Sequence, residues 1–322
     1  MNLIRRKSEK YLFYEALERR LPSNHYYLDT IQQNLRKERG GYTGELRVDR
    51  ELHETRHYEE YKVLRNLFVG SNQSYCQIDT LVIHQHFILI IEVKNIPGFL
   101  TYDEVTHQLT RQRDNGPVEG MGDPKSQIKR SERFVRNFLT KYKLSIPVHG
   151  MIVLSNPTSI LAEPFKDCPA VHVSGLYETM ENLHQLYTEH QNPPNFDTRK
   201  IQRLFQQHEP IIPPYRPTHI PITIFKDIQT GVLCSNCGKN KLDYKSKSWR
   251  CSHCKFKSES AHLEALNEFS ILFSREITTV EWMNFSGLKS LATTRRVLNE
   301  SNLEKNGGNK NRKWIIHRIS KS

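Results

Sequence analysis

The sequence predicts an α/β protein in which a mixed sheet is flanked by helices and two small units follow toward the C-terminal end. Three observations predict this fold class. Residues 77–94 contain two apolar runs, each long enough for a strand, with acids and a lysine only at their ends. Helical segments precede and follow these runs, as in mixed α/β domains. Four cysteines and a further group of short helical segments lie beyond residue 230.

The elements of the predicted sheet domain follow from periodicity. In chain order we expect a mostly polar helix over 44–58, strands over 61–69, 77–83 and 87–94, short strands over 99–102 and 108–113, a helix over 125–142 and a buried strand over 148–154. Asp123 and Pro124 suit the start of the second helix, because Asp can cap a helix and Pro fits its first turn. Before this domain, residues 3–37 predict two amphipathic helices separated near Pro22.

Charged side chains gather at the ends of the two central strands. Side chains on a strand alternate between faces, so Glu92 and Lys94 share one face. Asp79 begins the preceding strand, and a hairpin around 84–86 can bring it beside Glu92. Two carboxylates and an ammonium group would then converge at one sheet edge.

These residue types suit phosphodiester hydrolysis. Mg²⁺ is a hard cation that prefers a few carboxylate oxygens and keeps several waters, so Asp79 and Glu92 would be its ligands. A nearby lysine, here Lys94, can orient the water or stabilise the pentavalent phosphorus. The alternative is a buried strand whose last residues reach solvent, where Glu and Lys are ordinary surface choices.

Four short motifs resemble a known family. They are Gly44-Glu45-Leu46, Gln77-Ile78-Asp79, Ile91-Glu92-Val93-Lys94-Asn95 followed by Gly98, and Asp123-Pro124-Lys125-Ser126-Gln127. Over roughly residues 40–155 the chain resembles the nuclease-related domain family, a branch of the PD-(D/E)xK restriction-endonuclease-like group found in many bacterial proteins. The resemblance implies a restriction-endonuclease-like fold with the order helix, three strands, helix, strand. It also implies Glu45 as an accessory acid, Asp79, Glu92 and Lys94 as the core of the site, and Gln127 as a polar contributor.

The turn between the two central strands departs from the expected glycine. It is His84-Gln85-His86, and its histidines could be extra metal ligands. Because a hairpin tip lies at the far end of the strand from Glu92, we interpret them as solvated turn residues and leave them out of the site.

Composition favours a polyanionic partner. The net charge is +12 and the pI near 9.4, and residues 239–322 alone hold 17 basic and 8 acidic side chains. A basic face can also serve solubility or contact an acidic membrane surface. No stretch approaches the roughly 18 apolar residues of a spanning helix, and residues 1–10 are not followed by a secretory hydrophobic core. We therefore expect a soluble, cytoplasmic protein without a membrane partner.

Four of the six cysteines have the spacing of a zinc site. Cys234-x2-Cys237 and Cys251-x2-Cys254 are two knuckles separated by 13 residues, and each can turn two thiolates toward one ion. We expect a zinc ribbon with a closed, structural Zn²⁺. Disulfides or free thiols are the alternative, but disulfides are rare in a reducing cytosol. His253 could replace a cysteine as ligand, although four cysteines already fill the site.

The last part of the chain resembles a helix-turn-helix with a wing. Helices are predicted over 263–273, 279–285 and 290–299, then a basic loop over 305–313 and a strand over 314–317. Arg295 and Arg296 could face the major groove, and Lys310, Arg312 and Lys313 the phosphates. The alternative is a small helical cap with a solvated basic tail.

Proline-rich segments and composition suggest six parts. They are N-terminal helices that pack on the core (1–38), the nuclease-related domain (39–155), a helical extension (156–208), a proline-rich linker (209–230), the zinc ribbon (231–258) and a winged-helix-like basic domain (259–322).

The sequence thus favours a Mg²⁺- or Mn²⁺-dependent nuclease that acts on nucleic acid, most naturally DNA. The competing class is a non-catalytic nucleic-acid-binding or regulatory protein that uses the same fold as a scaffold. DNA against RNA, single against double strands, and endo- against exonucleolytic cutting all stay open, as do oligomeric state and protein partners.

Overall fold

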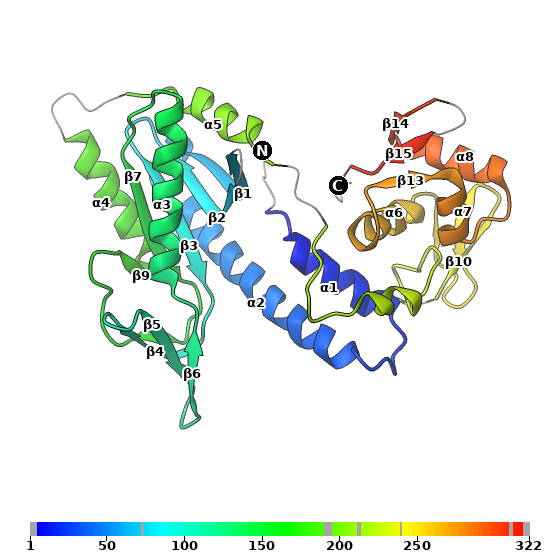
Figure 1. Cartoon of the computed structure of the whole chain (residues 1–322), viewed down its shortest axis with the longest axis horizontal. Helices are drawn as coiled ribbons and strands as arrows, with labels where there is room; N and C mark the ends of the chain where they lie inside the picture. Colours follow the sequence, from blue (N-terminus) through cyan, green and yellow to red (C-terminus); the bar gives the residue numbers. More distant parts are fainter. Residues whose placement is uncertain are drawn as a thin grey trace. The chain divides into compact units, whose positions relative to one another are not determined.

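Two units, each discontinuous in sequence, make up the structure, a computed structural model (Figure 1). It describes residues 5–71, 74–189, 195–210, 214–238, 240–308 and 312–317. The first, here called the sheet unit, comprises Met1–Arg6 and Arg39–Ile211; the second, the cysteine unit, comprises Lys7–Glu38 and Ile212–Ser322. None of the helices in the described part of the chain combines the length and apolarity that crossing a bilayer requires.

A mixed five-stranded sheet forms the centre of the sheet unit. Its strand order is β1-β2-β3-β7-β9, with bounds β1 Lys62–Ser71, β2 Ser74–Ile83, β3 Ile88–Lys94, β7 Val148–Leu154 and β9 Ala170–His172. β1, β2 and β3 pair antiparallel, whereas β3, β7 and β9 pair parallel. The parallel half is buried on both faces, which explains the continuous apolar runs in β3 and β7.

Helices cover both faces of this sheet. α3 (Pro124–Lys141) and α5 (Thr198–Gln207) share one hydrophobic core with Ile88 and Ile90, whereas α2 (Leu28–His53) and α4 (Leu176–Thr188) share another with Leu89 and Ile91. This two-residue alternation along β3 fixes which face each later side chain occupies. The order helix, three strands, helix, strand that the family resemblance implied is present as α2, β1 to β3, α3 and β7.

A second, smaller sheet is formed by three strands that lie between β3 and α3 in sequence and by a fourth that follows β7. Its strand order is β6-β5-β4-β8, with bounds β4 Gly98–Asp103, β5 Gln108–Gln112, β6 Val118–Met121 and β8 Ser159–Leu161. β4 and β5 match the two short strands expected from sequence. β6 and β8 were not expected, because such short, largely exposed strands carry no apolar alternation. Short 3₁₀ turns, η1 (Tyr58–Glu60) and η2 (Val173–Gly175), precede β1 and α4.

One expectation about the helices was wrong. Residues 28–53 form a single helix, α2, rather than one helix that ends near 37 and another that spans 44–58. Gly40 and Gly41 lie within this helix, although each glycine costs a helix about 1 kcal/mol. Tertiary contacts offset that cost: the Asn95 side chain donates to the carbonyl of Gly40, and Val48 and Leu52 are fully buried.

Residues between Val232 and Ile316 form one hydrophobic core in the cysteine unit, which is made up of small elements. They are α1 Glu9–Arg20, the first part of α2, η3 Ile222–Lys226, the strands β10 Leu242–Lys245, β11 Ser248–Cys251 and β12 Lys257–Ser258, then α6 Ala261–Leu272, β13 Glu276–Thr278, α7 Thr279–Ser286, α8 Leu291–Glu300, β14 Glu304–Asn306 and β15 Lys313–Ile315. The core contains all three tryptophans of the chain, Trp249, Trp282 and Trp314, each almost completely buried. The strands around the cysteines and the C-terminal helices therefore stabilise one another.

α1 belongs to the cysteine unit because it packs on α6. Arg20, whose side chain is fully buried, donates from Nη2 to Glu268 at 2.5 Å, and Arg19 reaches Glu268 at 2.8 Å and Glu264 at 3.0 Å. A buried arginine needs such partners, since an unpaired buried charge costs several kcal/mol. Residues 7–38 thus group with the C-terminal part of the chain in the cysteine unit.

Candidate active site and four-cysteine site

The pairing of β2 with β3 positions the two predicted carboxylates. The antiparallel register runs from Ile83 opposite Ile88 to Thr80 opposite Ile91, so Asp79 and Glu92 occupy the next positions. At these positions the regular backbone pairing of β2 with β3 has ended, and Oδ2 of Asp79 accepts a hydrogen bond from the backbone N–H of Val93 at 2.9 Å. The Asp79 carboxylate therefore replaces a backbone acceptor. Asp79 lies well inside β2 rather than at its start, because β2 begins at Ser74.

Lys94 connects β3 to α3. Its Nζ donates to Oε1 of Glu92 at 2.6 Å and to Oε1 of Gln127 at 3.0 Å. Glu92 and Lys94 lie on the same face as Ile88 and Ile90, which is the face that α3 covers. Two of the three N–H groups of the Lys94 ammonium thus have acceptors in the protein, and these hydrogen bonds fix the side chain between β3 and α3.

Glu45 reaches the same site from α2. Gly44, the preceding residue, lies so close to the ends of β3 and β7 that a Cβ there would fall 2.8 Å from Cβ of Asn95 and closer still to Oγ of Ser155. Only glycine permits this approach. The first motif of the family resemblance therefore has a physical reason: Gly44 lets the helix come near enough for Glu45 to join Asp79 and Glu92.

Arg5 is a member of this site that the sequence did not reveal. Its side chain is fully buried, and Nη1 donates to Oε2 of Glu45 and to the carbonyl of Asp79, each at 2.9 Å. Nε and Nη2 bind the two oxygens of Asp49 at 2.8 and 3.0 Å. Arg5 also donates to Asn66, where β1 has a positive φ of 49° opposite Asp79. Its partners lie 40 residues or more away in sequence, so no local pattern marks it.

Burial and mutual repulsion set the protonation of the acids. The pKa of Glu92 rises to about 7, first because the side chain is buried and then because the charge of Asp79 lies nearby. Burial also raises the pKa of Glu45 to about 7, against the opposing charge of Arg5. The pKa of Asp79 is raised by burial too, although the Val93 N–H and Lys94 oppose the shift. The carboxyl groups of Glu45, Asp79 and Glu92 thus lie where little water stabilises their charged forms.

The histidines of the β2–β3 turn are not solvated, so that interpretation was wrong. His84 is fully buried and His86 is 6% exposed. The backbone N–H of His84 bonds to the carbonyl of Phe87, and the ring of His84 lies against those of Tyr61 and Phe87. The turn is covered by neighbouring elements, which a two-strand hairpin considered alone cannot predict.

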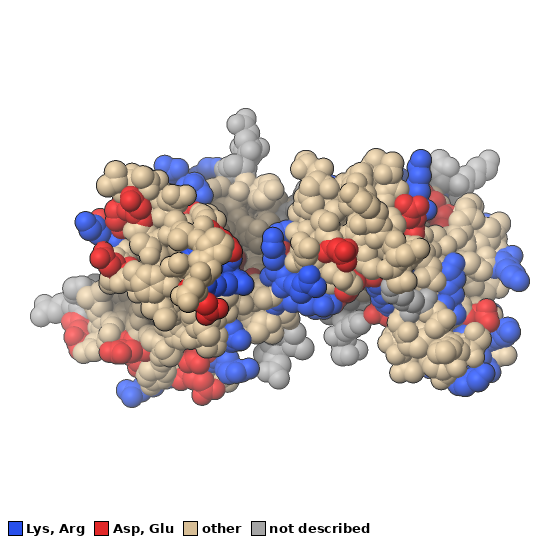
Figure 2. All heavy atoms as spheres, turned by 90° about the horizontal axis from the view of Figure 1, so that it is seen from below, with Lys and Arg blue, Asp and Glu red and all other residues tan. Residues whose placement is uncertain are grey.

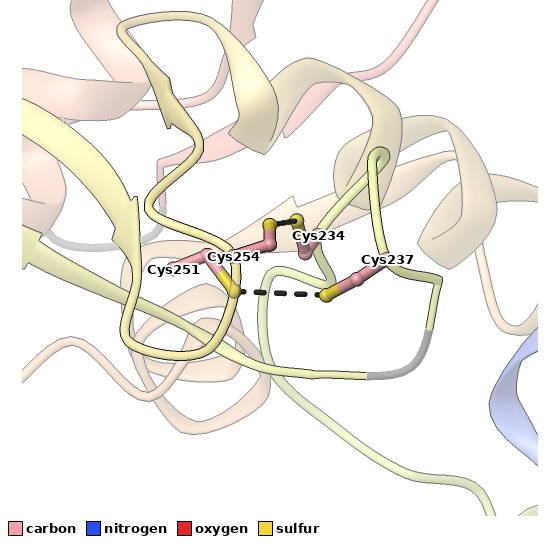
Figure 3. A group of neighbouring side chains, drawn as sticks. All are labelled: Cys234, Cys237, Cys251 and Cys254. Atoms are coloured by element: carbon pink, nitrogen blue, oxygen red, sulfur yellow. Dashed lines mark hydrogen bonds between the residues drawn. The ribbon is translucent and has the colours of Figure 1, made fainter.

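The four cysteines gather at the end of β11 and in the two loops beside it (Figure 3). Sγ of Cys234 lies 3.6 Å from Sγ of Cys254, and Sγ of Cys237 lies 3.6 Å from Sγ of Cys251. Thiolates around a tetrahedral zinc ion with bonds of about 2.3 Å are separated by about 3.8 Å. The cluster is therefore compatible with a structural zinc ion. Gly238, with a φ of 86°, makes the turn that follows the first knuckle.

The predicted nucleic-acid-binding residues have different surroundings. Arg295 is exposed on α8, whereas Arg296 lies over the Tyr244 ring at 6.0 Å and 3.9 Å from Glu300. Lys313 on β15 forms an ion pair with Glu276 at 2.8 Å, and Arg312 is half-buried. Lys310 lies outside the described residues. Both signs of charge occupy the face drawn in Figure 2, so the basic surplus does not form a single-sign surface there.

Comparisons with known proteins support a nuclease relationship for one part of the chain. A comparison with curated proteins gives no match. Among solved structures, the small subunit of the heterodimeric restriction endonuclease R.BspD6I is 14% identical over 62% of this chain and 88% of that chain, with a TM-score of 0.20. The family model described as "nuclease-related domain" matches residues 40–155, the segment that contains α2 from Gly40 onward, the central strands and α3. Residues 40–155 of this chain are therefore similar to the nuclease-related domain family.

Proposed function

We propose that the sheet unit is a metal-dependent nuclease that hydrolyses phosphodiester bonds in DNA, built on a restriction-endonuclease-like fold. The observation that carries this proposal is the hydrogen-bonded group Glu92–Lys94–Gln127, with Asp79 adjacent on β2. Glu45 would complete the site as an accessory acid. At an ordinary strand end on the surface, glutamate and lysine side chains reach water. Here Glu92 is only 3% exposed, and Lys94 donates hydrogen bonds to residues of both β3 and α3.

The donor set fits Mg²⁺ or Mn²⁺. Carboxylate oxygens are the ligands such hard cations prefer, and Asp79 and Glu92 would hold the ion. Because burial and the charge of Asp79 raise the pKa of Glu92, a cation between the two acids would relieve their repulsion. When bound, such an ion supplies Lewis-acid chemistry: it lowers the pKa of a coordinated water and offsets charge on the scissile phosphate.

The protein groups around the acids then have separate roles. Lys94 would orient the attacking water or neutralise charge on the pentavalent phosphorus with the N–H that it does not donate to Glu92 or Gln127. Gln127 would fix the ammonium group in place from α3. Arg5 would act as a positioning residue, since it touches Glu45 and the Asp79 backbone rather than the solvent-facing side of the site.

We further propose that the cysteine unit anchors the enzyme on DNA. This proposal is supported by the chain order α6, β13, α7, α8, β14, β15 and the sheet order β13-β15-β14, which are compatible with a winged helix. α7 begins with a capping box between Thr278 and Glu281 and ends at Gly287, whose φ of 78° turns the chain toward α8. α8 would be the recognition helix, Lys310, Arg312 and Lys313 would meet phosphates, and zinc on the four cysteines would hold the unit's core together.

The deciding experiment compares cleavage by the intact chain and by Lys94→Met. Supercoiled, linear and single-stranded DNA would be incubated with Mg²⁺, Mn²⁺ or EDTA. We expect metal-dependent cutting that falls at least about 100-fold in Lys94→Met, the typical loss when one transition-state donor is removed. Asp79→Asn should abolish cutting as well. Lys129→Met is the matched control, because Lys129 is exposed on the same α3 helix that carries Gln127.

Equal cutting by the wild type and Lys94→Met would refute the assignment of the site. DNA binding without cutting by any variant would instead support the scaffold class. Circular dichroism and thermal unfolding of each variant would establish that a lost activity does not reflect a lost fold.

A further inference from the structure

A second group of candidate metal ligands lies in the sheet unit, away from the nuclease-like site. It consists of His57 and Glu60 at η1, His184 on α4 and His84 in the β2–β3 turn, here called the histidine cluster. One ligand atom each from His57, Glu60 and His184 lie within 4.8 Å of one another. The residues come from three separate elements, so this proximity is a product of the fold and not of sequence spacing.

His84 is the most deeply buried member of the cluster. The residue is fully buried, yet neither ring nitrogen makes a hydrogen bond within the described part of the chain. Its Nε2 points at Glu60, 3.5 Å from Oε2, which is too long for a good hydrogen bond. Nδ1 of His184, a residue 8% exposed, is likewise without a partner among the described residues. Buried imidazole nitrogens normally have a partner, because a buried polar atom without one has lost its hydrogen bonds to water and gained none in return.

The geometry points to a transition-metal site: we propose that His57, Glu60 and His184 bind a Zn²⁺-type divalent ion, with His84 as the fourth ligand. Three imidazoles and one carboxylate form a donor set that suits Zn²⁺, Co²⁺ or Ni²⁺ and differs from the carboxylate site proposed for Mg²⁺. The ion would bind one ring nitrogen each of His84 and His184, two residues with nitrogens that have no hydrogen-bond partner among the described residues. Burial lowers the pKa of His84 to about 4, so its ring is in the neutral form that binds metals.

Binding requires one ring to move. The rings of His57 and His184 are stacked, with centroids 3.6 Å apart and planes 5° from parallel, and an ion cannot lie in two parallel ring planes at once. His57 is the ring able to turn, because it is half-buried and precedes the short η1 turn, whereas His184 is held in α4. Glu60 is exposed, which gives the ion a route from solvent. A bound ion would connect η1, the β2–β3 turn and α4.

The test counts zinc in the full-length protein. After loading with excess Zn²⁺ and removal of loosely bound ion, mass spectrometry should find two zinc ions per chain, one on the cysteines and one on the histidine cluster. Competition with a metal-sensitive dye would then measure the second ion's affinity. We expect a loss of at least about tenfold in Glu60→Gln and in His184→Gln, because even the loss of an outer partner of a metal ligand costs about 10–100-fold.

Two controls make the result decisive. Cys254→Ser should lose the cysteine-bound ion and keep the other, and His107→Asn should keep both, since His107 is exposed in the β4–β5 turn with a φ of 56° that asparagine tolerates. Glu60→Gln changes an exposed side chain, so it tests the site even if His184→Gln does not fold. One zinc ion per wild-type chain, or an unchanged second affinity in Glu60→Gln, would overturn the proposal.

Discussion

Arg5 donates from Nη1 to Oε2 of Glu45 at 2.9 Å while its own side chain is completely buried. The same guanidinium binds both oxygens of Asp49 and the carbonyl of Asp79. Opposing charges offset its burial so fully that the pKa of Arg5 is raised rather than lowered. Arg5, near the N-terminus of the chain, is thus a buried cation that binds the side chain of Glu45 and the backbone of Asp79, two acids of the candidate active site.

Replacing Arg5 should destabilise the sheet unit strongly. Arg5→Met keeps a comparable length but leaves Glu45 without its ion-pair partner and Asp49 with Arg65 alone, and removing one member of a buried ion pair typically costs about 3–5 kcal/mol. Arg6→Met is the control, because Arg6 is exposed and contributes its backbone carbonyl to Asn66. Urea unfolding followed by circular dichroism would measure the difference. Equal unfolding free energies for the two variants would contradict the structural role of Arg5.

Two glycines of α2 should respond to alanine in opposite directions. Gly44→Ala forces a Cβ against Asn95 and Ser155, which should destabilise the sheet unit by about 1–3 kcal/mol and displace Glu45. Gly41 has no atom within 4 Å of such a Cβ, so Gly41→Ala should stabilise the helix by about 0.5–1 kcal/mol. Thermal unfolding of both variants checks this. Destabilisation by Gly41→Ala as large as that by Gly44→Ala would show that the close approach is not what requires glycine.

A buried histidine should make the stability of the cysteine unit depend on pH. His262 accepts a hydrogen bond from Trp249 at 3.1 Å and lies 3.1 Å from Ser301, and burial lowers its pKa to about 4. Between pH 6.5 and 4 the unfolded chain binds a proton that the folded unit does not. Stability contributed by neutral His262 is therefore complete above about pH 6.5 and falls as pH decreases toward 4, by up to about 3 kcal/mol.

Tryptophan fluorescence isolates this effect, because all three tryptophans lie in the cysteine unit. Urea unfolding of the wild type and of His262→Gln at pH 7.5 and 4.5 should show a smaller loss of stability in the variant. His317→Gln, which changes an exposed histidine beside Glu304, should behave as the wild type. If the loss of stability between pH 7.5 and 4.5 were equal in all three proteins, groups other than His262 would be responsible for it.

The parts of the site that sequence could predict are those set by local geometry. Glu92 and Lys94 share a face because strands alternate, and the apolar runs on both sides indicated adjacent strands. Asp79 required one further inference, that the strands form a hairpin. Glu45 and Gln127 came from the family resemblance alone, since nothing in helical periodicity indicates which residue of a helix reaches a sheet edge.

What sequence could not predict depends on contacts between distant segments. Arg5 and Asp49 are 44 residues apart, and the burial of His84 depends on elements that follow it by as many as 100 residues. The continuity of α2 through Gly40 likewise follows from tertiary packing, which local propensity does not include. Residues 7–38 looked like ordinary amphipathic helices, and only the buried Arg20–Glu268 pair explains why α1 packs with α6.

The binding role of α8 is best tested with single substitutions. Deleting residues 259–322 would expose the core that these residues share with Trp249 and Cys251, so lost binding would not separate contact from folding. Arg295 is exposed and can reach DNA without losing an intramolecular partner in the described part of the chain. Arg296 is already engaged by Tyr244 and Glu300, so its replacement should weaken binding less.

Arg295→Gln should therefore weaken DNA binding in a way that salt reveals. If Arg295 meets a phosphate, its loss reduces the slope of log affinity against log salt by about 1; if it meets a base edge, the slope is kept and about 1–3 kcal/mol of sequence discrimination is lost. The control is Lys226→Gln, which makes the same change in net charge at an exposed position of η3, outside α7 and α8. Equal losses in the two variants would mean that only the overall charge matters, because a contact-specific role requires Arg295 to exceed this control.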